Sequence, residues 1–184
     1  MSELTDEIKS LGLELGFERA EEIPARLIPC DPALRRYCEA DVCGQYKKCW
    51  MCPTATGSPE FQIAKLHMYK TAIVLTQEYP CKDMCDKAEV DSLHIMHERR
   101  SQLLWKCVQK LGRTKDDARV LSVGGCHLCP VCAYKTGEPC RHPDLSCPSL
   151  SGYCVKVAEL ADRLGLDYIG KNGGIVFYAV VLLK

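Results

Sequence analysis

Four cysteines with ferredoxin-like spacing stand out first in this sequence. Cys126, Cys129 and Cys132 are each separated by two residues, and Cys140 follows after a longer gap. Thiolates are soft ligands that suit iron–sulfur clusters and zinc. A C-x2-C-x2-C run is typical of ferredoxins, where one loop supplies three corners of a cubane and a more distant cysteine supplies the fourth. The pattern therefore favours a 4Fe–4S cluster on these four residues, with zinc as the alternative metal.

A second, looser group of cysteines precedes it in the chain. Cys49 and Cys52 form a C-x2-C pair that is followed by Pro53, as in ferredoxin motifs. Cys38 and Cys43 lie shortly before this pair. Four thiolates so close in sequence are enough for a second 4Fe–4S cluster. The alternative is that they are buried free cysteines that pack as small hydrophobic side chains.

Other residues with ligand chemistry carry weaker signals. His127 and His142 are adjacent to Cys126 and Cys140, so a mixed Cys/His zinc site can be drawn, although hydrogen bonding in a loop is the simpler role for each. His94 and His97 are spaced as neighbours on a helix, and a core or surface position is the simpler interpretation for both. The spacing leaves open the roles of the remaining cysteines: Cys30, Cys81, Cys85, Cys107, Cys147 and Cys154.

Composition limits the class of protein. The chain has 184 residues, 47% of them hydrophobic, and its 24 Lys and Arg balance 24 Asp and Glu. This neutral balance argues against binding to nucleic acid or to an anionic membrane surface. The start of the chain lacks the basic and apolar regions of a secretory signal, so we expect a cytoplasmic protein. Because thiols stay reduced there, the 14 cysteines indicate metal binding better than they indicate a disulfide scaffold.

The hydrophobic pattern predicts an α+β fold. We expect one domain over residues 1–184, with a small, mainly antiparallel sheet, helices covering one face, and Cys-rich loops at about 30–57 and 124–148. The expected helices are 3–15, a short one from Asp31, one capped by Ser58, 86–111, and a Ser-capped one at 149–164. The expected strands are 71–79, 118–125 and a C-terminal hairpin that turns at Asn172-Gly173.

Two segments resemble a prokaryotic family of predicted metal-binding proteins, a domain of unknown function. They are "CEADVCGQYKKCWMCPTATG" at 38–57 and "GGCHLCPVCAYKTGEPCRHPDLSCPSLSGY" at 124–153. Cys38, Cys43 and Cys52 match the first family pattern, and Cys126, Cys129, Cys132 and Cys140 match the second. Cys49 falls outside the pattern, and Lys47 and Thr54 stand where the family more often has glycine and proline. The resemblance implies a metal, with iron–sulfur favoured, and it implies no particular reaction.

The sequence thus predicts an iron–sulfur protein with one or two 4Fe–4S clusters that transfers electrons to a partner enzyme. Basic residues around the cysteines would suit an acidic redox partner such as a flavodoxin or ferredoxin. One alternative is a zinc-held structural or interaction module. A second alternative is an enzyme in which a three-cysteine cluster leaves one iron open to substrate. The sequence does not specify an oligomeric state.

Overall fold

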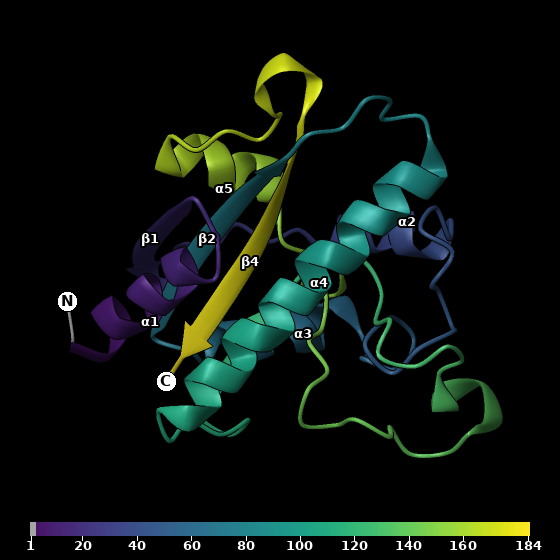
Figure 1. Ribbon diagram of the computed structural model, residues 1–184. Helices are drawn as coiled ribbons and strands as arrows, with labels where there is room; N and C mark the ends of the chain where they lie inside the picture. Colours follow the sequence, from purple (N-terminus) through teal and green to yellow (C-terminus); the bar gives the residue numbers. More distant parts are fainter. Residues whose placement is uncertain (1–2) are drawn as a thin grey trace.

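A four-stranded antiparallel sheet forms the centre of the computed structural model, which describes residues 3–184 (Figure 1). The strand order is β1-β2-β4-β3, so the two long strands β2 and β4 lie in the middle. All three strand pairs are antiparallel. The strands are β1 (Arg19–Pro24), β2 (Thr71–Tyr79), β3 (Ala118–Leu121) and β4 (Ile175–Leu183).

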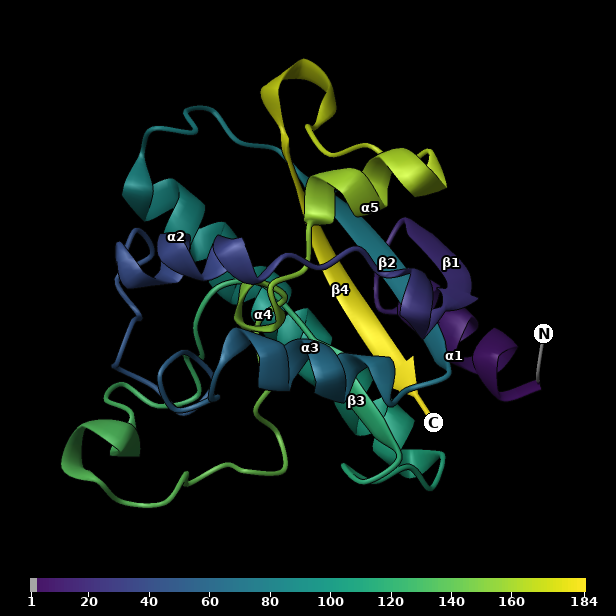
Figure 2. The ribbon, with the colours of Figure 1, turned by 180° about the vertical axis from the view of Figure 1, so that it is seen from behind.

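Helices cover both faces of this sheet. The α-helices are α1 (Glu3–Glu14), α2 (Arg35–Glu39), α3 (Pro59–His67), α4 (Lys87–Lys110) and α5 (Val157–Leu164). In Figure 1, α1 and α4 lie in front of the sheet, and Figure 2 shows α3 and α5 on the opposite face. The expectation that helices cover a single face is therefore wrong, although the α+β class and the antiparallel sheet are confirmed.

A run of consecutive apolar residues in β2 explains the two covered faces. Ile73 and Leu75 pack with Leu104 of α4, whereas Ala72 and Val74 pack with residues of α3 and α5. Successive side chains of a strand point to opposite faces, so the consecutive apolar residues at 72–75 must be buried on both sides. The sequence "TAIVLTQEY" already carries this signature, which a one-sided sheet would not need.

Most expected elements are present, with three differences. The strand at 71–79, the Ser58 cap, which accepts the Phe61 amide, and the 86–111 helix are confirmed. The helix expected from 149 begins only at Val157, after a short 3-10 helix η4 (Ser151–Tyr153), and no serine caps it. The C-terminal hairpin is reduced to one bridge, between Ile169 and Ile175, because the chain before the turn forms no strand. Strand β1 was not expected at all.

The two cysteine-rich segments lie on the same side of the molecule, away from β1 (Figures 1 and 2). The first runs through α2 to the start of α3, and the second leaves the end of the edge strand β3. Two backbone hydrogen bonds close the base of the second loop, because Ser122 pairs with Pro148 and Leu150. The candidate site lies where these two segments meet. No helix among residues 3–184 is long and apolar enough to cross a membrane.

Candidate metal centre

Asp41 organises the first cysteine loop. Its carboxylate accepts the Tyr46 amide at 2.8 Å and the Lys48 ammonium at 2.7 Å. Lys48 also donates to the carbonyl of Gly44 at 2.8 Å. These bonds tie together the two sides of the turn that contains Cys43. Arg35, which is buried, anchors the loop to the fold by donating to the carbonyls of Gly57 and Gly152.

Three thiols of this loop face one small cavity. Cys38, Cys43 and Cys52 line a space of about 160 Å³ together with His94, Gly124 and two serines. Cys38 is on α2, and Cys52 lies in the turns before α3. Cys49 is not in this lining. The structure therefore brings together the three cysteines that match the family pattern and separates the fourth candidate from the cavity.

Cys49 instead faces the second cysteine loop. It is 1% exposed, hydrogen-bonds with the thiol of Cys52, and accepts the backbone N–H of Cys126. Cys126 in turn is close enough to Cys140 and Cys49 for their charges to interact. Cys49 thus lies between the two predicted ligand groups.

The second loop is held to α4 by a buried carboxylate. Glu98, 2% exposed, accepts the backbone N–H of His127 at 2.9 and 3.0 Å and contacts its Nδ1 at 2.8 Å. Gln102 donates to the same carboxylate at 2.7 Å. Cys126 is consequently fixed at the edge of the core, since its neighbour cannot move away from α4 without leaving a buried charge unpaired.

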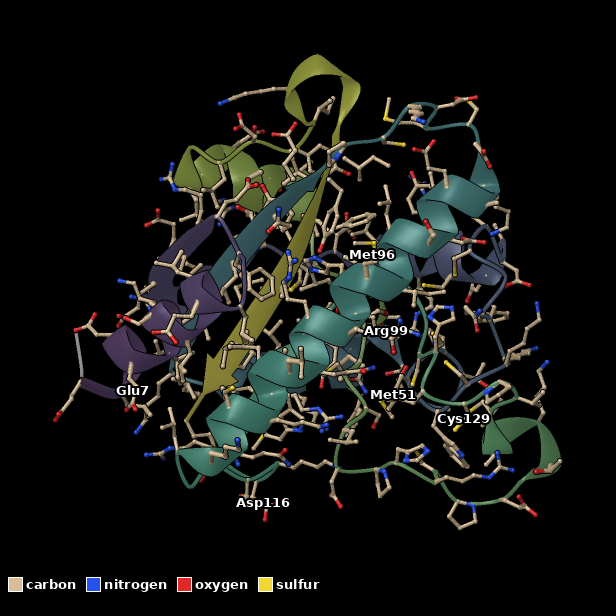
Figure 3. All side chains as sticks on the ribbon, in the orientation of Figure 1. Glu7, Met51, Met96, Arg99, Asp116 and Cys129 are labelled. Atoms are coloured by element: carbon tan, nitrogen blue, oxygen red, sulfur yellow. The ribbon has the colours of Figure 1, made fainter. Side chains whose placement is uncertain are left out.

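The remaining cysteines of the second loop follow Cys126 farther along the loop. Figure 3 shows Cys129 on the part of this loop that runs beside a short helical turn, which is η3 (Ala133–Thr136). Cys132 immediately precedes that turn. Arg141 donates to the carbonyl of Val131 at 3.1 Å, which brings the neighbours of Cys132 and Cys140 together. All four predicted ligands of this loop are partly buried.

The two cysteine loops pack directly on one another. The Trp50 indole N–H donates to the carbonyl of Glu138 at 3.0 Å, and its ring meets Tyr134 edge to face at 5.0 Å between centroids. The Thr54 and Tyr134 hydroxyls are 3.2 Å apart. Trp50 therefore joins the two loops.

Burial and hydrogen bonding shift the pKa of four of these thiols. Burial raises the pKa of Cys38 and of Cys126 above the ordinary value for a thiol. The hydrogen bond between Cys49 and Cys52 lowers the pKa of Cys49 and raises that of Cys52, so the pair gives up one proton far more readily than two. Metal ligation requires thiolates, and binding must therefore release protons from this region.

The donor set suits a soft metal, but the thiols are not yet closed around one. Within residues 3–184, no three His, Cys, Asp or Glu side chains are arranged so that they could hold a single metal ion. Soft thiolates converge on one cavity in the first loop and follow ferredoxin spacing in the second, which fits iron–sulfur or zinc in chemical kind.

The histidines that were weighed as ligands have other partners or surroundings. His127 is paired with Glu98, and the bond to that carboxylate raises its pKa. His142 is exposed. His97 is fully buried among aromatic rings in the core, as expected from the apolar stripe of its helix. His94, one turn earlier, stacks on Phe177 at 4.6 Å and lines the cavity of the three thiols.

Cysteines outside the two groups are scattered. Cys81 and Cys85 lie in the loop that precedes α4 in the chain, where Cys81 is partly buried and Cys85 is exposed. Cys107 is partly buried on α4. Cys30 and Cys154 lie on neighbouring segments joined by the bridge between Cys30 and Val155, and burial raises the pKa of both thiols. Cys147 packs in the core beneath α4.

Sequence reasoning overlooked two carboxylates that position the loops, Asp41 and Glu98. Glu98 shares a helix face with Gln102 and Trp105, all of which are buried. Glu98, Gln102 and Trp105 are spaced i, i+4 and i+7, which places an acidic residue on the buried face of the helix. This spacing is a signal for a buried carboxylate that the sequence offers. Asp41 had a weaker signal, because Asp in a Gly-containing turn is common whether or not it holds a site.

Comparison with known proteins agrees with the cysteine pattern. No curated protein and no solved structure matches the chain. A family model described as "Predicted metal-binding protein (DUF2284)" matches residues 21–183, which include both cysteine loops and all of the sheet except the first two residues of β1. A match over this share of the sequence establishes that the chain belongs to this family of predicted metal-binding proteins.

Proposed function

We propose that the chain is a cytoplasmic iron–sulfur protein whose two cysteine loops hold 4Fe–4S clusters and pass single electrons between partner proteins. The observation that carries this proposal is the packing of the two loops through Trp50, Glu138 and Tyr134. Clusters held by loops in direct contact are close enough for an electron to move from one to the other. Each cluster would gain one electron from the donor side and lose it to the acceptor side, with no group transferred.

Cys126, Cys129, Cys132 and Cys140 would hold the first of these clusters. The run of three cysteines at two-residue gaps supports iron–sulfur over zinc, because zinc sites use such knuckles two ligands at a time. The Cys126 end is fixed by Glu98, and the Cys140 end is drawn in by Arg141. Arg141 would also place positive charge beside a cluster that is negatively charged overall.

The cysteines of the first loop support a further candidate function, catalysis at an open iron site. Cys38, Cys43 and Cys52 share a cavity from which Cys49 is absent, so this cluster would have three thiolates and one iron free to take a ligand. The cavity also adjoins a much larger cleft of about 760 Å³ that Cys38 and Cys43 line as well. An electron carrier needs no such opening, whereas an enzyme does.

The test is metal and sulfide analysis of protein purified without oxygen, with EPR after dithionite reduction. Two 4Fe–4S clusters predict about eight irons and eight sulfides per chain and the signals of interacting reduced clusters. Cys129→Ser should remove about half of the iron, because it deletes one ligand of one cluster. Cys107→Ser on α4 is the matched control and should leave the iron content unchanged.

Two results would overturn the proposal. Zinc at one or two ions per chain with no iron would leave a zinc-held interaction module as the function. Iron content and visible absorption that are unaffected by Cys129→Ser would show that the 126–140 loop does not ligate the metal.

A further inference from the structure

We propose that the cleft beside the Cys38, Cys43 and Cys52 group binds a small uncharged organic molecule with an apolar body and one oxygen-bearing head. The cleft consists of three adjoining cavities of about 760, 360 and 160 Å³. They meet at His94, Gly124 and Ser151, each of which lines all three. The smallest cavity contains the three thiols.

The 360 Å³ chamber fixes the character of the ligand's body. Its walls come from α4, the start of η4, the start of α5 and the start of β4, and they include Phe177, Tyr178, Leu150 and Val157. No Asp, Glu, Lys or Arg is among the residues that line it. A charged ligand would lose its hydration here without gaining an ionic partner, which is costly. The volume lies in the range of small-molecule sites, which are mostly apolar with a few placed polar groups.

The rim of the cleft is unusually apolar for a surface. Five large hydrophobic side chains that are 51–75% exposed line these cavities. They come from three separate segments, namely α2 with the turn after it, the loop before α4 and the loop before β4: Tyr37, Val42, Met84, Tyr168 and Ile169. Leaving such surface in water is unfavourable by about 25 cal/mol per Å². A bound apolar molecule would cover it.

Polar groups at the junction orient the ligand's head. His94 and Ser151 stand between the apolar chamber and the thiol cavity, and they are able to hydrogen-bond to a hydroxyl or carbonyl oxygen. The backbone approaches Gln45 closely beside this point, because a side chain at Gly125 would collide with Gln45. The head would thus point toward Cys38, Cys43 and Cys52. This orientation, unlike the binding of the body, rests on the proposed open iron site.

The first arm of the test uses an uncharged fluorescent probe, 6-propionyl-2-(dimethylamino)naphthalene, which has an apolar ring body and one ketone head. We expect saturable binding with a blue-shifted emission, and no comparable binding of the anionic dye 8-anilinonaphthalene-1-sulfonate. Ser151→Trp, which fills the junction from an exposed position, should weaken the apparent Kd at least tenfold. Ser10→Trp, on the exposed side of α1, is the matched control. Ile169→Glu should also weaken binding, whereas Leu13→Glu should not.

The second arm separates this inference from the proposed function. In anaerobically purified protein with its clusters, the ketone probe should change the EPR signal of one reduced cluster, and Ser151→Trp should prevent the change. Saturable probe binding without iron in the protein would retain the cleft but overturn the open iron site. Full cluster content without probe binding would overturn the inference and leave the electron carrier intact. Dimerisation that Ile169→Glu abolishes, with no probe binding, would also overturn it, because the apolar rim would then be an interface between two copies.

Discussion

Trp50 donates its indole N–H to the backbone carbonyl of Glu138, across 88 positions of sequence, and this bond joins the two cysteine loops. The indole ring also meets Tyr134 edge to face. Neither loop contains a helix longer than a few residues around these contacts. Loops with so little secondary structure depend on such tertiary contacts for a fixed position, so Trp50 helps to set the relative placement of the two ligand groups.

We expect Trp50→Phe to lower the free energy of unfolding by about 1 kcal/mol, because it removes one hydrogen bond and keeps a ring against Tyr134. Trp50→Ala should cost about 1 kcal/mol more through loss of the ring contact. Hydrogen–deuterium exchange should accelerate at 126–140 in both variants, while amides of β2 serve as the internal reference. Equal acceleration in β2 would mean that the change destabilises the whole fold and that Trp50 does not specifically join the loops.

Cys49 and Cys52 should behave differently despite their C-x2-C spacing. Cys52 lines the cavity shared with Cys38 and Cys43, and Cys49 does not. Cys52→Ser should therefore remove one cluster and reduce iron from about eight to about four per chain. Cys49→Ser should retain the iron but lose the thiol that accepts the Cys126 amide, and we expect it to shift the EPR signal of the 126–140 cluster. Equal iron loss in the two variants would show that Cys49 is a ligand of the same cluster as Cys38, Cys43 and Cys52.

The sequence was sufficient for the core elements because their signals are local. The strand 71–79 contains a continuous apolar run at 72–75, and Asp86 caps α4 through the amides of Ala88 and Glu89. Strand β1 gave no such signal, since half of the residues in "RAEEIP" are charged and it contains a proline. It is an edge strand that pairs only with β2, and edge strands tolerate charge and proline at such positions.

The assignment of thiols to sites was less predictable for a physical reason. Spacing places Cys49 and Cys52 together, and their thiols do hydrogen-bond. The same Cys49 also accepts the Cys126 amide, a contact that exists only because Glu98 and Trp50 hold the second loop in place. Long-range contacts of this kind depend on the whole fold, and no local spacing rule encodes them.

Lys47 occupies a backbone conformation that suits glycine. Its φ is +56°, a left-handed value that costs an ordinary residue about 1–2 kcal/mol, and this is the position where the family resemblance expects glycine. Lys47→Gly should be more stable than Lys47→Ala by about 1 kcal/mol, because only glycine relieves the φ while both variants lose the contact of Lys47 with the Tyr46 ring. Chemical denaturation of the two variants measures the difference. A more stable Ala variant would contradict the assignment of strain to this residue.

His97 should make the fold sensitive to mild acid. Burial lowers its pKa from 6.5 to about 3, and the Arg100 guanidinium and His94 act in the same direction. Its Nδ1 lies 3.2 Å from the Tyr79 hydroxyl, and Phe17 and Phe177 pack against the ring. Above pH 6.5 the residue is neutral in both the folded and the unfolded chain, so it adds no pH dependence there.

Between pH 6.5 and 3 the unfolded chain binds a proton that the folded chain excludes. The contribution of His97 to stability should therefore fall by about 1.4 kcal/mol for each pH unit in this window. His97→Gln removes the titration and keeps a polar group opposite Tyr79, so the difference in unfolding free energy between it and the wild type should shrink as the pH falls from 7.5 to 5. The thiols are common to both proteins, and their effect cancels in this difference. His67→Gln, at the exposed end of α3, should run parallel to the wild type, and a parallel line for His97→Gln would show that His97 is not the group responsible.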